Sequence, residues 1–192
     1  GLLLGSGVRA VGTTSVYSQG TPTETGVATH MAIEGEGFFK VYKGNVVAFT
    51  RDGSFTLDST GQLVTGDGHI LDPQVTIPPL ATDVSISPGG VVSWKLNAVA
   101  ATGPTILLSR FTNPAGLQYL GGYLYLETVA SGPEAQLPAG ADGMGSIRNK
   151  FLEGANVEVV SELVSLITAQ RAYEINSRAI RAGDERLSTA SD

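Results

Sequence analysis

The chain has 192 residues, of which 25 are glycine, 9 are proline and none is cysteine, and its formal net charge is −6 at pH 7. The lack of cysteine excludes a disulfide framework and a thiolate nucleophile, and the acidic balance without a Lys/Arg cluster argues against nucleic-acid or anionic-membrane binding. A charged fraction of only 16% and many turn-forming residues favour a β core, and no apolar run is long enough for membrane insertion.

Residues 1–28 are expected to form an extended connector. Small, polar and β-branched residues dominate there, with Val8, Val11 and Val16 separated by Gly, Thr and Ser. Because the chain does not begin with methionine, we expect it to be cut from a longer protein. We also expect no cleaved secretory signal, since the first residues lack its basic region and cleavage site.

Residues 29–129 predict a compact antiparallel β domain. Apolar runs such as Phe38 to Tyr42 and Val46 to Thr50 are punctuated by glycines, as is typical of short strands joined by tight turns. Asp-Gly pairs at 52–53 and 67–68 favour the positive φ that hairpin turns need. The expected architecture is a mainly β meander of hairpins, barrel-like or sandwich-like, inserted between the terminal segments.

Residues 130–150 are predicted to be a return linker. Their first part, up to Gly145, is rich in Gly, Pro and Ala. Such a composition buries little apolar surface to offset the entropy lost on ordering. A short extended stretch, Ser146 to Leu152, then leads into the last segment.

Residues 151–192 form the predicted helical segment, with one long amphipathic C-terminal α-helix. The run from Asn156 to Ile180 contains neither Gly nor Pro, and its apolar residues recur at helical spacing. Asn156 is a candidate N-cap, and Arg178 and Arg181 suit the negative end of the helix dipole. The apolar stripe has two interpretations that the pattern alone does not separate: it covers the chain's own β domain, or it meets a partner.

The sequence offers little support for a catalytic, cofactor or metal site. His30 and His69 each have one acid nearby, Glu34 and Asp72, but in β or turn sequence that spacing does not bring ligands to one face. Gly35-Glu36-Gly37 is too short for a phosphate loop, and a bulge or close backbone approach explains it better. We therefore predict no catalytic residues, no cofactor and no bound metal, and a protein that is not an enzyme.

Several segments together resemble the bacterial flagellar rod and hook family. The resemblance rests on Phe151 to Val157 with Gln170 to Ile180 near the end, on Ala32 to Val41, on Thr50 to Phe55, on Leu57-Asp58 with Gly61 to Thr65, and on Phe111 to Leu117. These motifs cover nearly the whole chain in order. The start Leu4 to Arg9 and the segment Tyr123 to Thr128 are most similar to the distal-rod members, whereas proximal-rod and hook proteins share parts of the pattern.

The resemblance implies a structural subunit of the flagellar basal-body rod that polymerises helically and transmits torque from motor to hook. The implied partners are copies of itself, the axial proteins on the proximal-rod and hook sides, and the surrounding bushing rings. The implied location is the periplasmic rod, reached through the flagellar type III export apparatus. Family members also have an N-terminal helix that pairs with the C-terminal one, and the polar tail from Ser188 departs from their usual apolar finish.

On this interpretation the helix carries the assembly interface. The expected packing positions are Val160, Leu163, Val164, Ile167, Ala172 and Ile175, and the candidates for specific polar contacts are Arg171, Tyr173 and Asn176. The alternatives are a proximal-rod or hook-type subunit, or a secreted ligand-binding β module. The last would need an exposed aromatic platform, and Trp94, the only tryptophan, lies in an alternating strand where packing is expected.

Overall fold

The computed structural model of the chain describes residues 19–155, 163–164 and 166–178. It divides into two compact units, Gly1–Gly154, here the β unit, and Ala155–Asp192, here the helical unit. Within the helical unit, residues 163–164 and 166–178 are α-helical, and the expected cap at Asn156 lies outside the described residues. In the part of the chain that is described, no helix is both long and apolar enough to cross a membrane.

The β unit confirms the mainly β, antiparallel prediction. Its strands follow the alternating apolar runs, in which every second side chain faces the core. In chain order they are β1 (Pro22–Glu24), β2 (Met31–Glu34), β3 (Phe38–Lys43), β4 (Val46–Thr50), β5 (Thr56–Leu57), β6 (Leu63–Val64), β7 (Ile70–Asp72), β8 (Thr82–Ile86), β9 (Val91–Leu96), β10 (Val99–Thr105), β11 (Leu107–Arg110), β12 (Gln118–Gly121), β13 (Leu124–Leu126), β14 (Ala135–Pro138), β15 (Ser146–Asn149) and β16 (Phe151–Glu153), with a short 3-10 helix, η1 (Pro114–Gly116), before β12.

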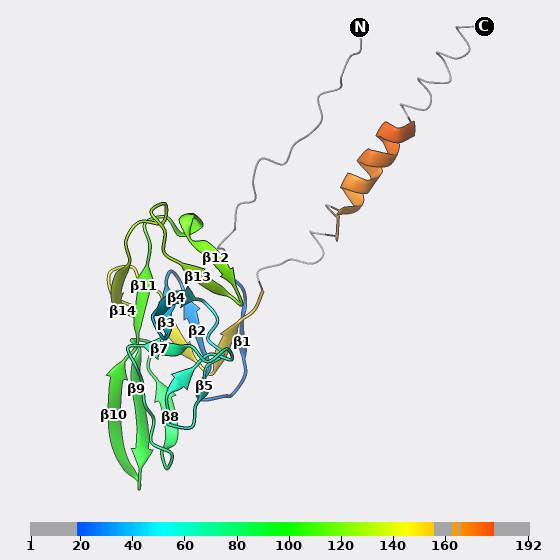
Figure 1. Ribbon diagram of the computed structural model, residues 1–192. Coiled ribbons are helices and arrows are strands. Elements are labelled where there is room, and N and C mark those ends of the chain that lie inside the picture. The colour runs from blue at the N-terminus through cyan, green and yellow to red at the C-terminus, as the bar shows by residue number, and fades with distance from the viewer. Residues whose placement is uncertain (1–18, 156–162, 165, 179–192) are drawn as a thin grey trace, which may run out of the picture. The chain divides into compact units, whose positions relative to one another are not determined.

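Strand β3 lies at the centre of the largest sheet. Its one edge pairs with β4, and its other edge is shared between β11, opposite Phe38 and Phe39, and β7, opposite Lys40 to Tyr42. The full path of this sheet is β12-β13-β4-β3-β7-β6-β5, with β11 and β14 branching from it. A three-stranded sheet of β10, β9 and β8 lies at one end of the β unit and the β12–β13 hairpin at the other (Figure 1).

One core holds these sheets together. Edge-to-face packing joins Phe39 to Phe55, whose ring centroids are 5.3 Å apart. Both side chains are fully buried together with Met31, Ile33 and Leu108. A smaller cluster of Phe38, Phe49, Phe111 and Leu117 lies beneath the β12–β13 hairpin.

The linker expected at residues 130–150 instead carries two strands of the β unit. Strand β14 pairs with β11, and β15 pairs with β2. Met144 and Ile147 are buried in the main core. The average composition misled the prediction, because few apolar side chains suffice when backbone pairing satisfies the polar groups of the segment.

The connector expected at residues 1–28 also differs where it is described. Strand β1 pairs with β16, so Pro22 lies opposite Glu153 and Glu24 opposite Phe151. Residues 151–153, expected to open the helical segment, therefore form the last strand of the β unit. The segment 1–18 lies outside the described residues.

The Asp-Gly pair at 52–53 does not form the expected hairpin turn. Gly53 packs against Met31, and its carbonyl oxygen accepts a hydrogen bond of 3.1 Å from the Met31 N–H. A Cβ atom there would overlap the Met31 carbonyl, so glycine is required by close approach and not by a turn. The pair at 67–68 does turn with the expected positive φ, which is 78° at Gly68.

Candidate assembly surface

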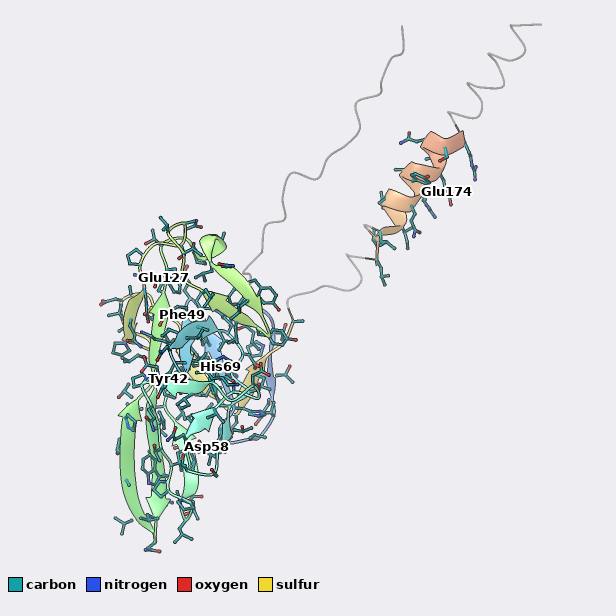
Figure 2. All side chains as sticks on the ribbon, viewed as in Figure 1. Tyr42, Phe49, Asp58, His69, Glu127 and Glu174 are labelled. Carbon is teal, nitrogen blue, oxygen red and sulfur yellow. The ribbon has the colours of Figure 1, made fainter. Side chains whose placement is uncertain are left out.

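The helix of the helical unit exposes apolar side chains. At roughly 100° per residue, Leu163, Val164, Ile167, Arg171 and Ile175 project from one side of it. We call these residues the first stripe. Leu163 is 53% exposed and Ile167 47% exposed, although both are strongly apolar. Figure 2 shows the side chains of the helix around its whole circumference, with Glu174 labelled.

A second apolar stripe was missing from the sequence prediction. Leu166, Ala169 and Tyr173 recur at three- and four-residue spacing and so lie on the side roughly opposite the first stripe. Leu166 is 56% exposed and Tyr173 75% exposed. The spacing of these residues could have revealed this stripe, but the longer first stripe dominated the pattern.

The predicted interface residues that the structure describes fall into three groups. Those of the first stripe are exposed on one side, and Tyr173 belongs to the second stripe. Ala172 and Asn176 are exposed between the two stripes. Val160 lies outside the described residues.

The β unit contains an ion-pair cluster around Lys40 that is partly shielded from solvent. Lys40 on β3 donates a hydrogen bond of 2.9 Å to Glu134, whose other oxygen accepts one of 2.6 Å from the buried Ser109 hydroxyl. Asp72 lies 3.6 Å from the same ammonium. The hydrogen bond and charge of Glu134 raise the pKa of Lys40 above its usual value, against the opposing effect of burial. The branching of the sheet at β3 brings these four side chains together.

His30 and Asp58 make hydrogen bonds that serve local structure. His30 Nδ1 lies 2.9 Å from the Thr25 hydroxyl, and no group of metal-ligating side chains gathers within the described residues. Asp58 accepts hydrogen bonds from the Gln62 and Thr60 backbone N–H groups and from the Thr60 hydroxyl, which together close a turn. Because these donors stabilise the carboxylate, with Gln62 first, the pKa of Asp58 lies below its usual value.

Trp94 does not form an exposed platform. It lies on β9, is partly buried, and packs against the main core. Its ring covers Gly103 of β10 so closely that a Cβ atom there would overlap it. The arrangement is that of a packed cross-strand pair.

Comparison with known proteins assigns both units to one family. Residues 32–94 match the profile of the flagellar hook protein FlgE/F/G D1 domain, and residues 148–192 match that of the flagellar basal body rod FlgEFG protein C-terminal region. The flagellar basal-body rod protein FlgG of Buchnera aphidicola subsp. Schizaphis graminum is 44% identical over 193 residues, covering 97% of this chain and 73% of that protein.

Two proteins of Caulobacter vibrioides help to place the chain within the family. The organism's FlgG is 40% identical over 194 residues, covering 100% of this chain and 74% of that protein. Its flagellar basal-body rod protein FlgF is 36% identical over 162 residues, covering 82% of this chain and 62% of that protein. These similarities show that the chain belongs to the bacterial flagellar basal-body rod protein family, on the FlgG side of it, and is a structural subunit of the rod.

Proposed function

We propose that this subunit polymerises helically with copies of itself through the helical unit and forms the distal rod. In that position it is a drive shaft that transmits torque from the motor to the hook. The proposed partners at its two ends are the proximal-rod and hook-side axial proteins, and the proposed surrounding partners are the bushing rings. Its proposed place is the periplasm, reached through the flagellar type III export apparatus.

The observation that carries the proposal is the pair of apolar stripes on one helix. Fully burying a Leu or Ile side chain contributes about 1.5–3 kcal/mol, so leaving several half-exposed is unfavourable without partners. Two stripes on roughly opposite sides are suited to two different neighbours. Repeated contacts between unlike surfaces build helical filaments, whereas one self-complementary surface closes a dimer.

We therefore propose different roles for the two units. The β unit is a self-contained body, and the helical unit supplies the assembly contacts. The residues of the first stripe and Ala172 pack against one neighbour. Leu166 and Tyr173 pack against another, and Asn176 contributes polar contacts between them.

The experiment introduces one carboxylate into each stripe of the full-length protein, as Ile167→Asp and Leu166→Asp. Each change should weaken its own contact by about tenfold to a hundredfold, because it replaces apolar burial with a charge. We expect polymers, seen by electron microscopy, and swimming to be lost when the variant gene replaces the chromosomal copy. Thermal unfolding of the β unit should stay at the wild-type temperature.

The matched controls are Ile167→Leu and Leu166→Met, which keep an apolar side chain of similar volume. Both should assemble and support swimming. Normal polymers from Ile167→Asp would refute the role of the first stripe, and normal polymers from Leu166→Asp would refute that of the second.

A further inference from the structure

We propose that Arg51 and Glu153 form a lock that fastens strand β16 to the body of the β unit. Strand β16 ends at Glu153 and is the last strand before the helical unit. If the helical unit is fixed in the polymer, as the proposed function requires, mechanical force from it reaches the β unit through this strand. The lock makes the strand pass that force to the body and keeps it from peeling away.

Arg51 uses its whole guanidinium group for this purpose. Its Nε donates to Glu153 Oε2 at 2.9 Å. Its Nη1 donates to the carbonyl oxygens of Gly35 and Gly37 at 3.1 and 3.0 Å, and its Nη2 donates to that of Ile33 at 3.3 Å. The side chain is 20% exposed, so this ion pair is better shielded from water than an ordinary surface pair.

Strands β1 and β16 form a two-stranded ribbon, here the terminal ribbon, and Glu153 joins it to this arginine. Its second oxygen, Oε1, accepts a hydrogen bond of 2.9 Å from the backbone N–H of Gly20, just before β1. Its side chain is only 13% exposed. One carboxylate therefore holds both the entering and the leaving segment against the body.

Gln19 adds a second attachment beside the first. Its side-chain amide donates to the Ile33 carbonyl at 3.0 Å and accepts from the Gly35 N–H at 3.0 Å. The body presents these groups through a turn in which Gly35 and Gly37 have φ values of 110° and 136°. Between them, the Glu36 carbonyl accepts a hydrogen bond of 2.7 Å from the Gly145 N–H. Two glycines thus aim the carbonyls of one turn at the arginine.

The ribbon needs such a lock at its outer end. Strands β1 and β16 pair over three residues each, and a two-stranded ribbon of that length is marginal by itself. At its inner end, backbone hydrogen bonds tie Lys150 to Thr25 and His30. At the outer end, beyond Glu153, the Gly154 N–H bonds only to Thr21 of the same ribbon. The first hydrogen bond to the body that a pull on the chain after Gly154 meets is therefore that of the Arg51–Glu153 pair.

The test compares Arg51→Lys and Glu153→Gln with wild type by amide hydrogen exchange of the whole chain in solution. Lysine keeps the charge but cannot donate in the three directions that the arginine uses. We expect the amides of residues 20–21, 23–24 and 151–154 to exchange about tenfold to a hundredfold faster. Amides of β3 and β4 should keep their wild-type rates. The double variant Arg51→Glu with Glu153→Arg should not restore the wild type, because glutamate cannot donate to the three carbonyls.

Lys95→Met is the matched control. It removes an ion pair to Asp83 of similar length, 3.0 Å, from the β8–β9 surface, where both side chains are more than half exposed. This variant should leave the ribbon amides unchanged. Wild-type exchange of the ribbon in Arg51→Lys and Glu153→Gln would overturn the lock, and so would equal acceleration throughout the β unit.

The exchange measurement does not depend on polymerisation, so it separates this inference from the proposed function. In cells, the two lock variants should still form rods but should swim more slowly than wild type as the viscosity of the medium rises. Assembly failure of Ile167→Asp concerns the helix alone. Wild-type swimming of the lock variants at high viscosity would overturn the mechanical role of the pair.

Discussion

The β unit and the helical unit treat apolar side chains in opposite ways. In the β unit, residues such as Phe39, Phe55 and Leu108 are fully buried. On the helix, Leu163, Leu166 and Ile167 are about half exposed. On the proposed function, the buried residues of the β unit serve folding and the exposed apolar residues of the helix serve contacts with neighbours. The proposal therefore predicts that folding and assembly can be damaged separately.

The largest loss of stability should come from adding a single methyl group to the β unit. Gly53→Ala places a Cβ atom on the Met31 carbonyl, so backbone must move, and we expect a loss of at least about 3 kcal/mol in the free energy of unfolding. Gly66→Ala is the control, because no atom lies near its Cβ position. Chemical denaturation of both variants measures the difference. A stably folded Gly53→Ala protein would show that the close packing of this segment is not required.

A smaller effect is expected from Lys40→Met, which leaves Glu134 without its ammonium partner. The free energy of unfolding should fall by about 1–3 kcal/mol near neutral pH. Because the folded-state pKa of Lys40 is raised, its contribution is complete below the unfolded value of 10.5 and is lost as pH rises through the folded value. The gap between variant and wild type should therefore narrow in strongly alkaline solution.

Lys43→Met on the same strand is the control for this pH series, since its ammonium bonds only to the exposed Asp67 carbonyl. Rods should still assemble from the Lys40→Met protein. If this variant stays folded yet fails to polymerise, the separation between the two units is wrong.

The smallest effect should come from Asp58→Asn, in an exposed turn. The amide oxygen can still accept the hydrogen bonds from Thr60 and Gln62, but the charge is lost. Because the folded pKa of Asp58 is depressed, its carboxylate stabilises the fold above the unfolded value of 3.8 and ceases to do so as pH falls through the folded value. Melting temperatures of variant and wild type should differ slightly at pH 7 and converge in acid.

The sequence predicted those strands of the β unit that stand out as apolar runs. It missed the strands whose place is set by backbone pairing with distant segments. The strand-like run expected from Val46 to Thr50 is β4 itself. The partners β14 and β15 were missed, because their few apolar residues become informative only when β11 and β2 lie beside them. Likewise, the close backbone approach expected at Gly35 to Gly37 is confirmed at Gly35, where a Cβ atom would lie 3.0 Å from the Cα of Gly145, a residue far along the chain.

For the candidate site, periodicity was enough for the first stripe and not for the second. A helix with one apolar side is the usual pattern, so Leu166 and Tyr173 were not grouped in the prediction. Arg51 and Glu153 carry no local signal of their pairing, since an arginine after a strand and a glutamate before a glycine occur in many contexts. Only the three-dimensional placement of β4 and β16 relates them.

The pairing of the first and last strands also sets when the β unit can fold. Gly20 and Glu153 are 133 residues apart in sequence, and Met31 pairs with Asn149. Contacts at such separations carry a high loop-closure entropy and form slowly. A chain that has been synthesised only as far as residue 140 still lacks β16 and β15, the partners of β1 and β2. It must remain incompletely folded until nearly the whole β unit is available.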